Sequence, residues 1–133
     1  MLDMTALDDV ELRNFVKVMH EARFPDCDSD PAIMFSSYAT DWHSDAVDEQ
    51  ERRMRIAGDE SGLVSQERWR RWRGRPEEHV LMERMRVDPS QRRWLLQASS
   101  EEIRSVLRPF ILDDETLVAL LGHVRRLDAE GAE

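Results

Sequence analysis

The chain contains a single cysteine, Cys27, which excludes an internal disulfide and a zinc site built from several thiolates. Glycine and proline number only five each, too few for the many turns of an all-β chain. The sequence also lacks any run that approaches the roughly 18–20 apolar residues of a membrane-spanning helix. These shortages predict a helical protein that does not enter the membrane.

The N-terminal residues, MLDMTALDD, lack the basic and then apolar layout of a secretory signal peptide, so we expect a cytoplasmic location. At 133 residues, of which 41% are apolar, the chain is long enough to bury one real core. We therefore expect a single helical domain over residues 1–133, with a candidate internal break at residues 58–64.

Apolar residues recur at helical spacing along most of the chain, and no segment alternates as a strand does. Capping boxes are expected at Asp8 with Glu11 and at Ser99 with Glu102. The expected helices include residues 8–23, 31–57 and 77–87, one that begins after Ser65, one opened by Asp88-Pro89, and a C-terminal pair. The architecture predicted from this pattern is all-α, a compact bundle of about six short to medium helices.

Three apolar stripes mark the faces expected to pack. The first half of the helix expected from residue 31 carries Met34, Phe35, Tyr38, Trp42 and Ala46. The C-terminal pair carries two more, made of Ile103, Val106, Leu107 and Phe110 and of Leu117, Leu120, Leu121, Val124 and Leu127. The last stripe could equally line a buried core or the seam of a homodimer.

The net charge of −9 is unevenly distributed along the chain. Residues 1–62 carry fifteen acids and six bases, residues 63–94 five acids and nine arginines, and residues 95–133 eight acids and four arginines. The corresponding charges are −9, +4 and −4, which sum to the total. An acidic chain disfavours nucleic acid and anionic membranes as partners, and the basic middle could pair with the acidic flanks.

Residues 65–94, SQERWRRWRGRPEEHVLMERMRVDPSQRRW, hold nine of the eighteen arginines and three of the four tryptophans. Arginine binds carboxylates at two points and tryptophan supplies a large contact area. The segment therefore predicts a protein-binding surface formed by Arg68, Trp69, Arg71, Trp72, Arg75 and Trp94. A second interpretation stays open, in which Trp69 and Trp72, at i and i+3, are core anchors.

An acidic row at helical spacing is the alternative site, and it comprises Asp41, Asp45, Asp48 and Glu49. Such a row could mimic nucleic-acid charge in a small bacterial or phage regulator, or it could be a solvated helix face. A metal-dependent enzyme that uses His20, His43 and the acids of residues 26–49 is a third hypothesis. A calcium-loop pattern at residues 26–37 fails because Pro31 and Ser37 replace the required Gly and Glu.

Residues 82–127 carry an Asp-Pro, an Arg, a Leu pair, a polar cap, a helix ending near Phe, and Leu-Asp before a Leu-rich helix. This order resembles the C-terminal helical domain of RNA polymerase II-associated protein 3 and of related axonemal dynein assembly factors. The matching residues are Asp88, Pro89, Arg92, Leu96, Glu102, Phe110, Leu112, Asp113, Leu117 and Leu121. Met82 stands where the family has Trp, Ser99-Ser100 replaces a proline-containing turn, and residues 1–80 have no counterpart.

The resemblance implies an adaptor that docks onto chaperone-linked AAA+ ATPases. The residues themselves favour a non-enzymatic helical protein–protein interaction module whose contact surface lies around residues 65–94. No catalytic residue, cofactor or metal ligand is assigned, because no histidine, serine or cysteine lies in a recognisable catalytic motif.

Overall fold

The structure, a computed structural model, describes residues 3–25, 34, 36–72 and 74–131. Within these residues the chain forms one short 3-10 helix, η1 (Met4–Ala6), and seven α-helices, which confirms the all-α prediction. They are α1 (Asp9–Arg23), α3 (Ser37–Ala57), α4 (Glu60–Arg70), α5 (Pro76–Val87), α6 (Pro89–Gln97), α7 (Ser100–Val106) and α8 (Asp114–Glu130). The one β-type contact in the described part is an isolated bridge between Arg71 and Ile111.

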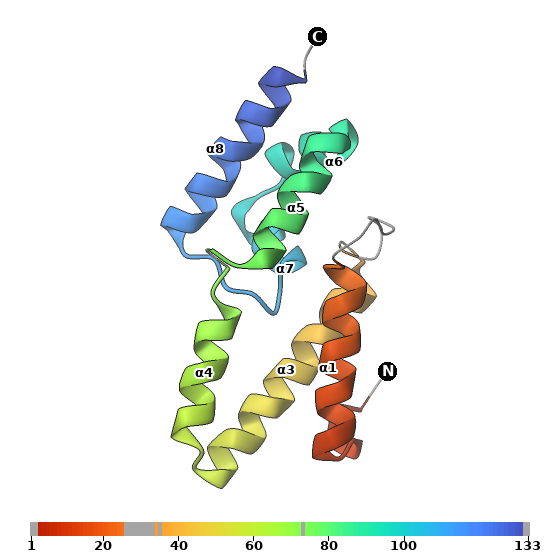
Figure 1. Cartoon of the computed structure of the whole chain (residues 1–133), viewed down its shortest axis with the longest axis vertical. Coiled ribbons are helices and arrows are strands. Elements are labelled where there is room, and N and C mark those ends of the chain that lie inside the picture. The colour runs from red at the N-terminus through yellow and green to blue at the C-terminus, as the bar shows by residue number, and fades with distance from the viewer. Residues whose placement is uncertain (1–2, 26–33, 35, 73, 132–133) are drawn as a thin grey trace.

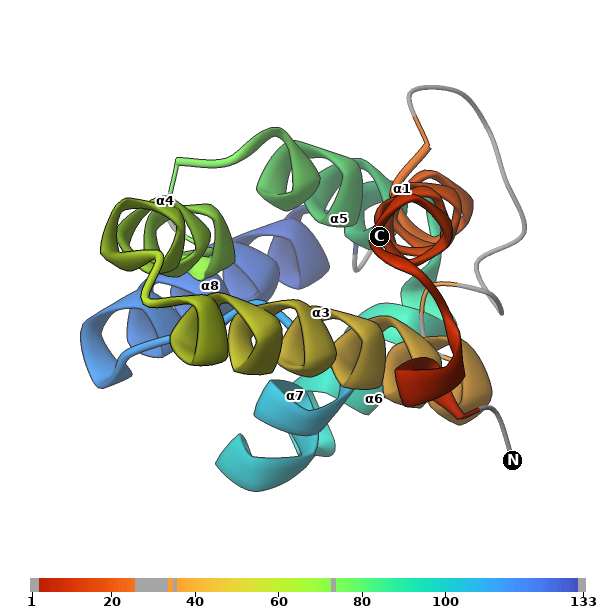
Figure 2. The ribbon, with the colours of Figure 1, turned by 90° about the horizontal axis from the view of Figure 1, so that it is seen from below.

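The helices form two groups along the long axis of the molecule (Figure 1). α1, α3 and α4 occupy the end nearer the N-terminus, and α5, α6, α7 and α8 occupy the other end. Seen along that axis, α1 and α4 lie on the same side of α3, side by side with a space between them (Figure 2). α3 therefore supports two helices that do not pack along each other.

Most helix ends follow the local signals in the sequence. The capping boxes at Asp8 and Ser99 are both formed, and Asp113 caps α8 by accepting a hydrogen bond from the Thr116 amide. The prediction that the third helix begins after Ser65 is wrong. α4 begins at Glu60, because Asp59 accepts a hydrogen bond from the Gly62 amide at 2.9 Å.

The expected break at residues 58–64 lies at the reversal between α3 and α4. Gly58 ends α3 with a left-handed backbone (φ 72°), a conformation that glycine adopts without steric cost. Only Gly58 and Asp59 separate the two helices, and both helices belong to the same group. A longer connection, residues 71–75, leads from α4 to α5 and so joins the two groups.

The main hydrophobic core lies among α5, α6, α7 and α8 and extends to Phe24, Met34 and Trp72. It includes most of the two C-terminal stripes: Ile103, Leu107, Phe110, Leu117, Leu120 and Val124 are buried. Most of the last stripe therefore packs inside its own chain, in agreement with the alternative that it lines a buried core. A smaller core of Met4, Leu12 and Ala46 joins η1, α1 and α3.

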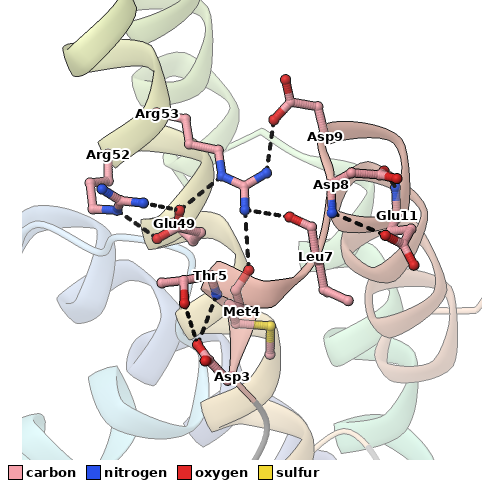
Figure 3. A network of polar contacts seen from close by, with 10 residues as sticks. All are labelled: Asp3, Met4, Thr5, Leu7, Asp8, Asp9, Glu11, Glu49, Arg52 and Arg53. Carbon is pink, nitrogen blue, oxygen red and sulfur yellow. Dashed lines mark hydrogen bonds and ion pairs between the residues drawn. The ribbon is translucent and has the colours of Figure 1, made fainter.

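Arg53 fastens the N-terminal segment to α3 (Figure 3). Its guanidinium donates to Asp9 and Glu49 at 2.8 Å each, and to the carbonyl oxygens of Leu7 and Met4 at 2.5 and 3.3 Å. Four acceptors from η1, α1 and α3 thus meet one side chain. A guanidinium is suited to this position because its five N–H donors point in fixed directions.

α3 begins at Ser37, after the cap formed by Ser36, and not at residue 31 as expected, and the apolar stripe predicted for the first half of that helix is divided between core and surface. Met34 and Ala46 are buried as expected, but Tyr38 is 71% exposed and Trp42 is 36% exposed. The neighbours of α3 cover a different face, which includes Thr40, His43, Ser44 and Val47. The prediction that Tyr38 and Trp42 pack inward is therefore wrong; Phe35 lies outside the described residues.

Candidate functional site

The Arg/Trp-rich segment does not form one continuous surface. Trp72 is fully buried and packs against Phe24 and Phe110, so it is a core residue and has no area with which to contact a partner. Trp69 is partly buried, with its ring 5.0 Å from that of Phe110. The interpretation of Trp72 as a contact residue is therefore corrected, and Trp69 keeps one accessible side.

Internal ion pairs occupy much of the segment's positive charge. Arg70 donates to Glu51 at 2.9 Å and lies 3.4 Å from Asp48, so α4 is tied to α3. Arg75 holds Glu77 with two hydrogen bonds, of 2.9 and 3.3 Å, and lies over the Trp69 ring. The Arg70 contacts agree with the expectation that the basic segment pairs with the acidic flanks, whereas Arg75 pairs within the segment.

The remaining residues of the proposed surface lie apart from one another. Arg68 is exposed and has no ion-pair partner in the described part of the chain. Arg71 is exposed and pairs with Glu67 one turn earlier, at 2.9 Å. Trp94 is 39% exposed on α6, which lies in the other group of helices from α4 (Figure 1). A single partner surface that spans both Arg68 and Trp94 is not formed.

A polar network occupies the junction between the two groups of helices. Arg23, at the end of α1, is fully buried and donates to the carbonyl oxygens of Val106 (2.7 Å) and Arg108 and to His43 Nδ1 (3.0 Å). Burial, together with the nearby charge of Arg108, lowers the pKa of Arg23 to about 10. Arg23 thereby links α1 and α3 to the end of α7.

His43 is the neutral member of this network. Burial, reinforced by the charge of Arg23, lowers its pKa to about 3. Because Arg23 donates to Nδ1, the proton of the neutral ring lies on Nε2, which is buried and has no hydrogen-bond partner among the described residues. The nearest rings are those of His20, Trp69 and Phe110, with centroids 6.0 to 6.3 Å away.

His20 and Glu77 form the second part of the network. His20 Nε2 lies 2.6 Å from Glu77 Oε1, and Arg75 holds the same carboxylate. Burial alone would raise the pKa of Glu77, but the hydrogen bonds from His20 and Arg75 outweigh it and lower the pKa to about 2. The carboxylate therefore stays ionised and anchors α1 to the start of α5.

A histidine beside a carboxylate also provides two of the three residues of a hydrolytic triad, and the third is a nucleophile. Here, however, the His20 ring is surrounded by the aromatic rings of Phe24, Trp69 and Phe110. Among the described residues, Glu77 is the only side chain hydrogen-bonded to it, so no hydroxyl or thiol is in place as a nucleophile. The arrangement is suited to holding helices together.

The metal hypothesis finds no donor set in the described part of the chain. No group of three or more His, Cys, Asp or Glu residues there could hold a metal ion. His43 faces the cationic Arg23, which opposes a second positive charge. Asp26, Cys27, Asp28, Asp30 and Pro31 lie outside the described residues.

The acidic row on α3 is partly neutralised. Glu49 is buried between Arg52 and Arg53, and the hydrogen bond from Arg52 is the main cause that lowers its pKa to about 2. Asp41 accepts from Arg108 at 2.7 Å, and Asp48 lies near Arg70. Asp45 is exposed and has no ion-pair partner among the described residues. Glu49 therefore does not belong to an exposed acidic face.

A groove runs between α1 and α4, with α3 as its floor. Its inner hollow, about 300 Å³, is lined by Arg13, Val16, Lys17, His20, Gln50, Gln66 and Trp69. An adjoining hollow of about 320 Å³ shares Arg13 and Gln50 and is also lined by Asp9, Leu12, Arg53, Met54, Ala57 and Asp59, so the cationic character is confined to the inner hollow. The residues that line the inner hollow come from α1, α3 and α4, and Figure 2 shows α1 and α4 on the same side of α3.

The inner hollow has an unusual charge for so acidic a chain. Arg13, Lys17 and His20 line it from successive turns of α1, and none of the described lining residues is acidic. Arg13 and Lys17 are exposed and have no ion-pair partner in the described part of the chain. On the floor, Gln66 donates to Gln50 at 3.1 Å, and Trp69 forms the opposite wall. We call this the α1–α4 groove; sequence inspection missed its α1 wall.

No protein-family model, curated protein or solved structure matches this chain. Among the described helices, none is long and apolar enough to cross a lipid bilayer.

Proposed function

We propose that this protein is a non-enzymatic interaction module that binds an acidic amphipathic helix of a protein partner in the α1–α4 groove. The observation that carries the proposal is the wall of Arg13 and Lys17, two cations with no ion-pair partner among the described residues, in a chain of net charge −9. Cations placed in a concave, partly apolar hollow favour a ligand of opposite sign.

The shape of the groove favours a helix as the occupant. The two adjoining hollows lie between α1 and α4 over α3, and a partner helix laid along them would contact these helices as helices pack in a bundle. Val16 on the α1 wall and Met54 on the α3 floor, both partly buried, offer apolar contacts, and Trp69 offers an aromatic wall. Carboxylates on the partner would meet Arg13 and Lys17, which sit one turn apart.

Two other functions have less support. A mimic of nucleic-acid charge needs an exposed acidic row, and Glu49, Asp48 and Asp41 are each engaged by arginines. A hydrolytic enzyme needs a nucleophile beside His20, and aromatic rings surround that residue instead. A cytoplasmic location remains part of the proposal.

Fluorescence anisotropy tests the proposal directly. The probe is a labelled helical peptide with leucines on one face and glutamates at i and i+4 on the flank, and a second peptide carries lysines instead of glutamates. We expect Arg13→Glu/Lys17→Glu to weaken binding of the acidic peptide at least tenfold. The control, Arg93→Glu/Arg125→Glu, makes the same charge change on α6 and α8 and should leave the affinity within twofold.

Two results would contradict the proposal. Equal weakening by both double variants would show that the peptide responds only to the net charge of the protein. Equal affinity of the wild-type protein for the acidic and the basic peptide would show that the cationic wall does not select its ligand.

A further inference from the structure

Tyr38 and Trp42 form an exposed aromatic pair on α3. Their rings lie 6.0 Å apart, tilted by 43°, and their exposed fractions are 71% and 36%. Large aromatic side chains are usually mostly buried, and Trp and Tyr are the residues most enriched where proteins bind one another. A pair of aromatic side chains held on a helix presents a contact area that loses little conformational entropy on binding.

The surroundings of this pair are acidic. Asp41 lies between the two aromatic residues in sequence, and Asp45 follows Trp42 by three residues on the same exposed side of α3. The carboxylate of Asp45 has no ion-pair partner among the described residues. An aromatic surface beside an unpaired carboxylate is complementary to a cationic side chain, which the ring face and the carboxylate attract together.

The chain itself shows how an arginine docks on this side of α3. Arg108, in the segment after α7, donates to the Asp41 carboxylate at 2.7 Å, and 45% of its side chain stays exposed. An arginine from a partner would make the equivalent contact with Asp45, one turn further along. We propose that the face formed by Tyr38, Trp42 and Asp45 is a docking surface for an arginine-bearing segment of a protein partner.

This surface is separate from the α1–α4 groove. The groove uses Gln50, Met54 and Ala57 of α3, which are displaced from Trp42 by about 12–23 Å along the helix axis and by about 60–120° around it. The two surfaces also select opposite charges. A protein with both could bridge an acidic and a basic partner, although the arginine-docking surface does not depend on the groove being occupied.

The test uses a labelled peptide with two arginines at i and i+4 and one leucine, together with its glutamate counterpart. In fluorescence anisotropy at physiological ionic strength, we expect the arginine peptide to bind and the glutamate peptide not to bind at this face. Asp45→Lys and Trp42→Ser should each weaken binding of the arginine peptide at least fivefold. Both positions are exposed, so circular dichroism should show unchanged helix content.

Glu130→Lys, the matched control, makes the same charge change near the end of α8 and should leave the affinity within twofold. The groove variant Arg13→Glu/Lys17→Glu should not weaken arginine-peptide binding, so failure of the groove proposal and failure of this one are distinguishable. The inference is overturned if Trp42→Ser binds like the wild type, or if Glu130→Lys weakens binding as much as Asp45→Lys. It is also overturned if the wild type is a dimer that Trp42→Ser dissociates, because a second copy would then be the occupant.

Discussion

Buried His43 should make the stability of this protein fall as the pH drops below neutrality. In the unfolded chain its pKa returns to 6.5, whereas in the folded protein burial and Arg23 lower the pKa to about 3. Between these values the unfolded state binds a proton that the folded state does not. The stabilisation is therefore complete above pH 6.5 and is lost progressively as the pH falls toward 3.

The magnitude follows from the two pKa values. At pH 5 the unfolded imidazole is almost fully protonated and the folded one almost fully neutral, which lowers the free energy of unfolding by about 2 kcal/mol. Glu77 and Glu49, whose pKa values fall from 4.5 to about 2, act in the same direction but contribute mainly below pH 4.5. The free energy of unfolding measured at pH 5 therefore reports mainly the contribution of His43.

Urea unfolding at pH 7.5 and pH 5.0 provides the assay, with the wild type compared with His43→Gln. Glutamine keeps an acceptor for Arg23 but does not titrate. The free energy of unfolding of His43→Gln should therefore fall much less between pH 7.5 and pH 5.0 than that of the wild type. His123→Gln, at an exposed position on α8, should lose as much as the wild type. If His43→Gln lost as much as the wild type, the buried neutral imidazole would not be the source of the effect.

Three further changes test the packing. Arg53→Met should lower the free energy of unfolding in urea titrations, since it leaves the acceptors of η1 and α1 without their donor, and it should cost more than Arg52→Met at the more exposed neighbouring position. Leu95→Ala, at a fully buried position on α6, should lower the free energy of unfolding by about 3 kcal/mol. A loss below about 1 kcal/mol would contradict the burial of Leu95 in the main core. Asp59→Ala should cost about 1 kcal/mol and fray the start of α4 in amide hydrogen exchange, and unchanged protection there would contradict the cap.

Local signals allowed most of the fold to be predicted from the sequence. The capping boxes at Asp8 and Ser99 and the cap at Asp113 depend on contacts within three residues, so the sequence alone identifies them. The helix that carries Leu117 has a single apolar face, so the sequence predicts which of its faces is buried. The start of α4 was predicted wrongly because the sequence offers two suitable caps, Asp59 and Ser65, and local contacts do not decide between them.

The candidate sites were harder to predict because they depend on contacts between distant segments. His20 and Glu77 are separated by 57 residues, and no local pattern pairs them. Trp42 and Trp72 are both tryptophans at helical spacing from other apolar residues, yet one is exposed and the other fully buried. Trp72 lies in the connection after α4, where Phe24 and Phe110 pack against it, whereas Trp42 lies on a side of α3 that its neighbouring helices leave partly exposed.

The central claim, that the α1–α4 groove receives an acidic helix, is tested most directly by mapping the bound peptide. Two-dimensional NMR of isotope-labelled protein, titrated with the glutamate-bearing helical peptide, reports which amides change environment. The account predicts the largest shifts at Arg13, Lys17, Gln50, Gln66 and Trp69, including the Trp69 indole. Shifts confined to α6 and α8, or spread evenly over the exposed arginines, would contradict it.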